Sequence, residues 1–233
     1  MGTIREEEIT IAGLRVVSVG EPETAEKVVV LLHGFQMQPS DLSPFAHALR
    51  TPTWFLFPEG PLPAEPQGRA WWHIDHKARE AIIANGPRDF AVQSPPDLPS
   101  ARERLRGLIA ELTPRIGQRP FVLGGFSQGA MLTSDTVLRS TFPLSALVLF
   151  SGSRIGWVEQ EPLYRAAKDR YRDLPVMVAH GETDPDIAFT AGQGLRDALE
   201  GAGAKVTWQP FPQGHEIPLV VWRTFRKFLA TVA

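Results

Sequence analysis

The sequence contains no cysteine among its 233 residues. Disulfide bonds, thiolate metal sites and a cysteine nucleophile are therefore excluded. No apolar run approaches the ~18 residues that a membrane-spanning helix needs. The start of the chain, Met1–Glu8, also lacks the basic and apolar segments of a secretory signal. We therefore expect no integral membrane segment and a cytoplasmic location.

The sequence also lacks a large excess of either charge. It contains 24 Lys and Arg and 26 Asp and Glu residues, which gives a formal net charge of −2. The basic residues are dispersed and form no stripe, so we expect no nucleic-acid partner. What the chain has is length and apolar content, with 43% hydrophobic residues. It can therefore bury a large core, and we expect one domain over residues 1–233.

Apolar β-branched runs alternate with helical patterns along the chain. A hairpin is expected around Ala12-Gly13. The later strands are predicted at residues 27–32, 54–57, 121–123, 146–150, 176–179 and 205–211. Helices are predicted at residues 42–49, 100–113, 128–138, 163–171, 189–202 and 221–229. This alternation predicts an α/β fold, a doubly wound and mostly parallel sheet with helices on both faces, whose ligands bind beyond the carboxyl ends of the strands.

Residues 58–99 interrupt the alternation, since eight of the 21 prolines fall here together with Trp71 and Trp72. A segment this long and irregular is typical of a functional loop region, and we expect it to contribute to a substrate site. A short helix is expected around residues 77–84. Regular structure returns at Ser100, where Glu103 three positions later predicts a capping box.

The segment Gly125-Phe126-Ser127-Gln128-Gly129 matches the pattern G-x-S-x-G. In this pattern a strand turns sharply into a helix, so that the serine hydroxyl is exposed on a strained turn. Five residues with three fixed positions also occur by chance. The apolar strand predicted before Ser127 and the helix predicted after it favour the catalytic interpretation over an ordinary turn.

A serine hydroxyl becomes a good nucleophile when a base takes its proton and an acid orients that base. Of six histidines, His215 is best placed, because it follows the last predicted strand. His33 and His180 are expected to hold loop backbones at strand ends. Asp184 is the expected acid, with Asp186 as the alternative. The order serine, acid, histidine is that of α/β-hydrolases.

The tetrahedral intermediate of acyl transfer needs backbone donors for its oxyanion. Gln128 N–H lies at the start of a predicted helix and supplies one. Gly34 allows the backbone to approach closely, so that Phe35 N–H is the expected second donor. The alternative for His33-Gly34 is an ordinary turn that ends a strand.

Four segments carry a family resemblance: Leu31-Leu32-His33-Gly34, Gly124–Ala130, His180–Pro185 and Gly214-His215-Glu216-Ile217. In collinear order they resemble the phospholipase/carboxylesterase family of α/β-hydrolases, which includes the acyl-protein thioesterases. The resemblance implies hydrolysis of carboxylic esters or thioesters without a metal. It also implies a catalytic triad and two oxyanion donors, namely Ser127, Asp184, His215, Phe35 and Gln128.

Two segments depart from the family pattern, residues 35–38 after the His-Gly pair and residues 70–75. Both bear on the substrate pocket, which we expect Phe35, Trp71 and Trp72 to line. The alternative is that the two tryptophans are core residues that anchor the Pro-rich segment.

The candidate residues are compatible with three functions. The first is a serine carboxylesterase that hydrolyses small to medium acyl esters through an acyl-enzyme, with no cofactor and a small-molecule ester as its partner. The second is an acyl-protein thioesterase or lysophospholipase. The third is a binding protein that keeps the fold without turnover. Such a protein has no need of a complete triad, so the presence of all three residues disfavours this function. A homodimer is left open.

Overall fold

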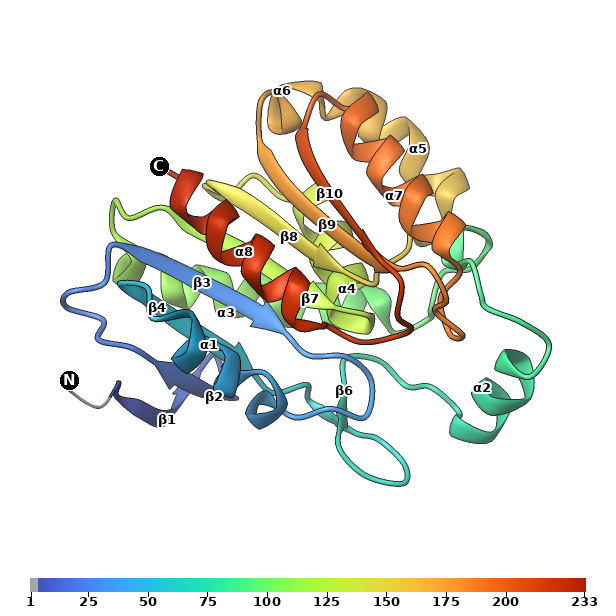
Figure 1. Cartoon of the computed structure of the whole chain (residues 1–233), viewed down its shortest axis with the longest axis horizontal. Helices are drawn as coiled ribbons and strands as arrows, with labels where there is room; N and C mark the ends of the chain where they lie inside the picture. Colours follow the sequence, from blue (N-terminus) through green and yellow to red (C-terminus); the bar gives the residue numbers. More distant parts are fainter. Residues whose placement is uncertain (1–3) are drawn as a thin grey trace.

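The computed structural model describes residues 4–233. Residues 1–3, which belong to the segment expected to lack a secretory signal, lie outside the described range. An eight-stranded sheet runs through the molecule (Figure 1). Its strands are β1 (Glu6–Ile11), β2 (Leu14–Val19), β3 (Lys27–Leu32), β4 (Thr53–Pro58), β7 (Phe121–Phe126), β8 (Ala146–Phe150), β9 (Pro175–Gly181) and β10 (Lys205–Phe211).

The strand order is β1-β2-β4-β3-β7-β8-β9-β10. β1 and β2 form the expected hairpin, and β2 pairs antiparallel with β4. Every other neighbouring pair in this sheet is parallel. The carboxyl ends of β3, β7, β9 and β10 therefore lie at the same edge, which confirms the predicted α/β fold with a mostly parallel sheet.

Helices cover both faces of the sheet (Figure 1). On one face, α1 and α8 pack against a cluster that includes Val29 and Phe150. On the other, α3, α4, α5 and α7 pack against a cluster that includes Val30 and Leu149. The helices are α1 (Ser43–Leu49), α3 (Leu98–Ile116), α4 (Gln128–Leu138), α5 (Trp157–Ala166), α6 (Lys168–Tyr171), α7 (Phe189–Gly201) and α8 (Leu219–Thr231).

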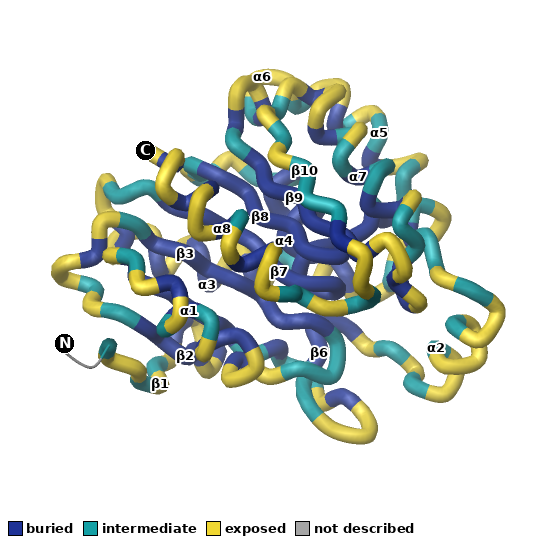
Figure 2. Tube along the Cα trace, viewed as in Figure 1, coloured by how far each residue is buried: buried dark blue, intermediate teal, exposed yellow. Residues whose placement is uncertain are grey.

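The continuous apolar runs explain the central strands, because a parallel strand covered by helices on both faces needs apolar side chains on both sides. Val28, Val29 and Val30 in β3 are all 0% exposed. Figure 2 shows the central strands buried, with the exposed residues concentrated on helices and loops. The core therefore holds the strand ends in fixed positions.

Residues 58–99 contain little regular structure. A two-stranded hairpin joins β5 (Leu62–Pro63) to β6 (Arg69–Ala70), and α2 (His76–Ile83) lies close to the position expected for a short helix. The segment also contains a single 3-10 turn, η2 (Phe90–Val92), and a second such turn, η1 (Pro39–Asp41), precedes α1. In Figure 1, α2 projects from the body of the molecule.

Two helix boundaries differ from the prediction. The capping box at Ser100 is wrong, because α3 begins at Leu98 with Asp97 at the N-cap, and Ser100 lies inside the helix. Pro99 fits the first turn, where its missing N–H removes no intrahelical hydrogen bond. The helix expected at residues 163–171 is two helices, and the first begins six residues earlier, at Trp157.

Candidate active site

Ser127 occupies the sharp turn between β7 and α4. Its backbone has φ 53° and ψ −116°, a strained combination for a residue other than glycine. Two hydrogen bonds hold it there: Ser127 N–H donates to Phe150 O at 2.8 Å, and Met131 N–H donates to Ser127 O at 3.0 Å. The side chain is thereby fixed at the carboxyl edge of the sheet, and the residue is 7% exposed.

The glycines that flank Ser127 are required by close backbone approach. A Cβ atom on Gly125 would lie 2.5 Å from the carbonyl carbon of Gly129. A Cβ atom on Gly129 would lie 2.4 Å from Leu32 O and 2.6 Å from His33 O. The first turn of α4 therefore packs directly on the end of β3, which brings Ser127 beside the loop that follows β3.

His215 links Ser127 to Asp184 through both of its ring nitrogens. Its Nδ1 lies 2.6 Å from Asp184 Oδ2, and its Nε2 lies 2.8 Å from Ser127 Oγ. Because a carboxylate accepts hydrogen bonds, Nδ1 carries the proton, and Nε2 is free to accept from the serine hydroxyl. This tautomer can remove the proton of Ser127.

Asp184 is held by the backbone of its own loop. Its Oδ1 accepts from Asp186 N–H at 2.8 Å and from Ile187 N–H at 2.9 Å. Its Oδ2 is thereby aimed at the ring of His215. Asp186 has different partners, since it pairs with Arg79 and Arg88. Of the two acids considered from the sequence, the geometry favours Asp184.

His33 and His180 support backbone, as expected. His33 Nδ1–H donates to Gly34 O at 2.7 Å, while Nε2 accepts from Gly60 N–H at 2.8 Å. Burial lowers the pKa of His33 to about 4, because a charged ring would lose its hydration. Burial likewise lowers the pKa of His180, whose Nε2 bonds to Ile187 O at 3.0 Å. Both rings are therefore neutral supports at neutral pH.

Two backbone N–H groups are available for an oxyanion. Within residues 4–233, neither Gln128 N–H nor Phe35 N–H donates a hydrogen bond to the protein. Gln128 begins α4, where the free N–H groups and the positive end of the helix dipole favour an anion. The loop that carries Phe35 is held by Gln36 N–H, which donates to Arg69 O at 3.0 Å.

Trp71 and Trp72 are each 1% exposed and pack in the core, although Trp72 also borders a cavity of about 450 Å³ beside α2. The reason lies in the hydrogen bonds of their segment. Trp71 N–H donates to Gln128 Oε1 at 2.8 Å, and Gln128 Nε2 donates to Trp72 O at 3.0 Å. The Trp71 indole N–H donates to His33 O at 2.9 Å. The last contact turns the Trp71 indole inward, in agreement with the alternative that it is a core residue.

The side chain of Gln128 is a functional feature that the sequence analysis missed. Its amide ties the Trp71-Trp72 segment to the start of α4, so it can position the loop beside Ser127. The available signal in the sequence was the glutamine directly after the serine. If that side chain is buried, its amide needs hydrogen-bond partners. The pairing of Asp186 with Arg79 and Arg88 was also missed, since those residues lie about one hundred positions apart.

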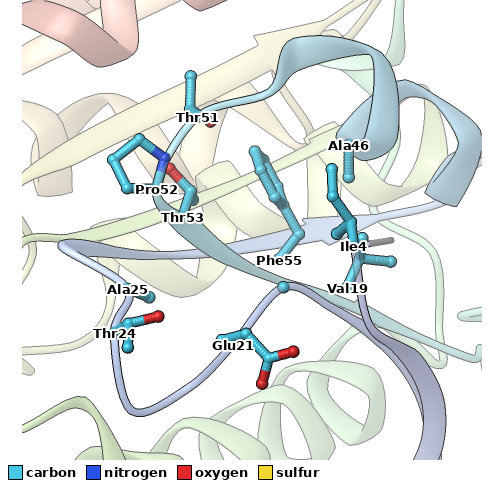
Figure 3. Close-up of a pocket in the computed structure, with 11 residues that line it drawn as sticks. Ile4, Val19, Glu21, Thr24, Ala25, Ala46, Thr51, Pro52, Thr53 and Phe55 are labelled. Carbon is cyan, nitrogen blue, oxygen red and sulfur yellow. The ribbon is translucent and has the colours of Figure 1, made fainter. Parts of the chain in front are cut away.

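Residues 4–233 form several cavities away from Ser127. One of them, with a volume of about 270 Å³, is lined by Val19, Thr53 and Phe55, which Figure 3 labels. Thr53 begins β4, so this cavity lies at the opposite end of the parallel strands from Ser127. A second cavity, of about 450 Å³, lies between α2 and the segment around Phe90. This second cavity is the nearer of the two to the catalytic residues, because Arg79 and Arg88 in its wall pair with Asp186.

Two further findings concern residues 4–233. No helix there is long and apolar enough to cross a membrane. No group of three His, Asp or Glu side chains there is arranged to hold a metal ion.

Comparison with known proteins places this site in a family. The sequence pattern of the phospholipase/carboxylesterase family matches residues 12–233. Acyl-protein thioesterase 1 of Kluyveromyces lactis is 29% identical over 198 residues, which are 80% of this chain and 81% of that protein. The crystal structure of esterase PE8 superposes with a TM-score of 0.71 at 23% identity over 100% of both chains. A carboxylesterase from Mesorhizobium loti gives a TM-score of 0.73 at 18% identity, covering 97% of this chain and 99% of that one. The chain therefore belongs to the phospholipase/carboxylesterase family of α/β-hydrolases and is a hydrolase that acts on ester bonds.

Proposed function

We propose that the protein is a serine carboxylesterase that hydrolyses small to medium acyl esters through an acyl-enzyme formed on Ser127. One observation carries the proposal: Ser127 Oγ, both nitrogens of His215 and Asp184 Oδ2 form an unbroken hydrogen-bonded series at 2.8 and 2.6 Å. The strained turn at Ser127 supports it, because strain of this kind is concentrated at functional sites.

In the first half of the reaction, Ser127 Oγ attacks the ester carbonyl carbon while its proton passes to His215 Nε2. The carbonyl oxygen becomes an oxyanion, which accepts hydrogen bonds from Gln128 N–H and Phe35 N–H. The C–O bond to the alcohol then breaks, and His215 returns the proton to the departing alkoxide. An acyl group remains on Ser127 as an ester.

In the second half, water takes the place of the alcohol. His215 Nε2 removes a proton from the water as its oxygen attacks the acyl carbon, and the same donors stabilise the second oxyanion. The bond to Ser127 Oγ breaks, and His215 returns the proton to it. Asp184 keeps its negative charge throughout, orients the ring and stabilises the imidazolium that forms twice in each turnover.

The preference for small to medium acyl groups rests on Phe35, which is half-buried in the loop after β3. The Arg79 guanidinium lies 5.6 Å from the centre of its ring and also pairs with Asp186, so these are the two bulky groups that we expect to limit the acyl chain. We keep the cytoplasmic location as a proposal from the sequence.

The second candidate is an acyl-protein thioesterase, favoured by the relative of that name in Kluyveromyces lactis. The two candidates differ in chain length and leaving group. Initial rates on acetyl to palmitoyl esters, and on the thioesters with the same acyl groups, separate them. A maximum at short to medium oxygen esters supports the carboxylesterase. A palmitoyl maximum with thioesters preferred supports the alternative. In both cases Ser127→Ala serves as the control that removes the nucleophile.

A further inference from the structure

Asp186 makes more charged contacts than the acid that orients His215. Its carboxylate pairs with Arg79 and Arg88, and Oδ2 lies 4.0 Å from His215 Nε2. Its side chain is 6% exposed. Burial alone would raise the pKa of Asp186, but His215, Arg88 and Arg79 together lower it below its ordinary value. Asp186 is thus an ionised junction between the site and residues 75–88, which we call the strap.

The strap has little apolar packing of its own. Its helix, α2, contains no buried residue, and Figure 2 shows it as exposed and intermediate throughout. An Asp75 side chain caps the helix by accepting from Ala78 N–H at 2.9 Å. A segment with few buried apolar contacts opens at low free-energy cost. Its position therefore depends on the polar contacts that tie it to the body.

Backbone holds the far end of the strap, whereas side chains hold its near end and its middle. At the far end, Arg88 N–H donates to Asp186 O at 2.8 Å and Ala188 N–H donates to Arg88 O at 2.9 Å, so backbone fixes this end. At the near end, Gln36 Nε2 lies 3.1 Å from His76 Nδ1. The middle is tied through a side chain, by the ion pair of Arg79 with Asp186.

Arg79 also contacts the loop that carries a proposed oxyanion donor. Its guanidinium lies 5.6 Å from the centre of the Phe35 ring while it pairs with Asp186. One side chain therefore joins three segments: the strap, the loop after β3 and the loop after β9. No other cation in the described residues stacks on Phe35.

Beneath the strap lies the cavity of about 450 Å³, which is bounded by Arg79 and Arg88 on the side of the site. Its apolar wall includes Trp72, Ile74, Ile82 and Phe90. Arg79 therefore lies between this cavity and Asp186, whose Oδ2 is 4.0 Å from His215 Nε2.

We propose that Arg79 determines acyl-chain specificity by latching the strap to Asp186. This inference rests on the proposed function. With the ion pair closed, Arg79 and Phe35 obstruct long acyl chains, and short esters reach Ser127 freely. With the ion pair broken, α2 moves away and the cavity beneath it accepts the longer chain. Arg88 keeps the far end of the strap in place in both states.

The test compares kcat/KM for the dodecanoyl and acetyl p-nitrophenyl esters in variants of the whole chain. Arg79→Gln should raise the ratio of dodecanoyl to acetyl by about fivefold, the size expected when one partly exposed ion pair is lost. Lys77→Gln is the matched control, because it removes one charge from an exposed position of the same helix. It should leave the ratio at the wild-type value.

Two further measurements separate a latch from a general loss of structure. Asp186→Asn should raise the same ratio, and the double variant with Arg79→Gln should add little to either single change. Amide hydrogen exchange over residues 76–83 should become faster in Arg79→Gln and remain unchanged in Lys77→Gln. In the wild type, raising salt to about 0.5 M should move the ratio toward the Arg79→Gln value, because salt screens the pair.

An unchanged ratio in Arg79→Gln overturns the latch, and so does an equal rise in Lys77→Gln or full additivity in the double variant. Ser127→Ala, assayed in parallel, distinguishes this failure from failure of the proposed function. If Ser127→Ala is inactive and the ratio does not change, the latch alone is wrong. If Ser127→Ala keeps turnover, the proposed nucleophile is wrong.

Discussion

Asp184 Oδ2 lies 2.6 Å from His215 Nδ1, whereas the nearest recorded approach of Asp186 to this ring is 4.0 Å, at Nε2. Asp184 therefore fixes the tautomer in which Nε2 accepts a proton. We predict that Asp184→Asn lowers kcat by up to ~10⁴, because an amide at this position favours the wrong tautomer. Steady-state kinetics on a short p-nitrophenyl ester measures the loss. Asp186→Asn should be far less damaging, and a larger loss there would reverse the assignment.

The contact of Gly129 with the end of β3 predicts a difference between two glycines in helices. Gly129→Ala would place a Cβ atom 2.4 Å from Leu32 O, so it should destabilise the fold by about 1–3 kcal/mol and disturb the turn at Ser127. Gly107→Ala in α3 meets nothing within 4 Å. It should stabilise by ~0.5–1 kcal/mol, because alanine is the better helix former. Urea unfolding measures both, and equal effects would contradict the packing.

The hydrogen bond from the Trp71 indole to His33 O predicts a stability loss without a change of substrate range. Trp71→Phe leaves a buried carbonyl oxygen without this donor, which should cost about 1–3 kcal/mol. Because Trp71 is a core residue, the acyl-chain profile of the folded variant should stay that of the wild type. Chemical unfolding and the ester panel together check this. A shifted chain-length maximum at wild-type stability would return Trp71 to the pocket.

Burial of His33 predicts acid sensitivity of the fold. The pKa of His33 is about 4 in the folded chain and ~6.5 when unfolded. The unfolded chain therefore binds the proton first as pH falls, and stability is lost between these two values. The loss amounts to about 3 kcal/mol from this residue. As the pH falls between these two values, the urea midpoint of the wild type should fall. The slope of the urea midpoint against pH should be smaller in His33→Gln. Identical slopes in the two proteins would refute the assignment.

Much of the fold could be predicted from local pattern. The predicted strands at 27–32, 146–150 and 205–211 have the observed bounds, because continuous apolar runs between turn residues leave few alternatives. The predicted start of α3 is wrong because the pattern of Ser100 and Glu103 also occurs inside a helix. The pattern over residues 163–171 predicts one helix, whereas the chain breaks near Ala167.

The candidate site was predictable in its order but not in its surroundings. Ser127 and His215 each follow a strand, and parallel strands bring such positions to one edge. Asp184 and Asp186 are only two positions apart, so the conformation of their loop decides which carboxylate meets His215, and sequence spacing does not determine that conformation. The orientation of Trp71 depends on hydrogen bonds to Gln128 and His33, which come from distant parts of the chain. Contacts of this kind have no local signature.

The proposed function requires Ser127 to be the covalent nucleophile. An organophosphate such as diethyl p-nitrophenyl phosphate reacts with an activated serine, releases p-nitrophenol and leaves a stable phosphoryl ester on Oγ. Peptide mass spectrometry of the inactivated protein locates that group, with Ser127→Ala treated in parallel. We predict one phosphoryl group, on the peptide that contains Ser127, formed in step with loss of esterase activity, and none on Ser127→Ala. Inactivation with the phosphoryl group on another residue, or equal modification of Ser127→Ala, would contradict the account.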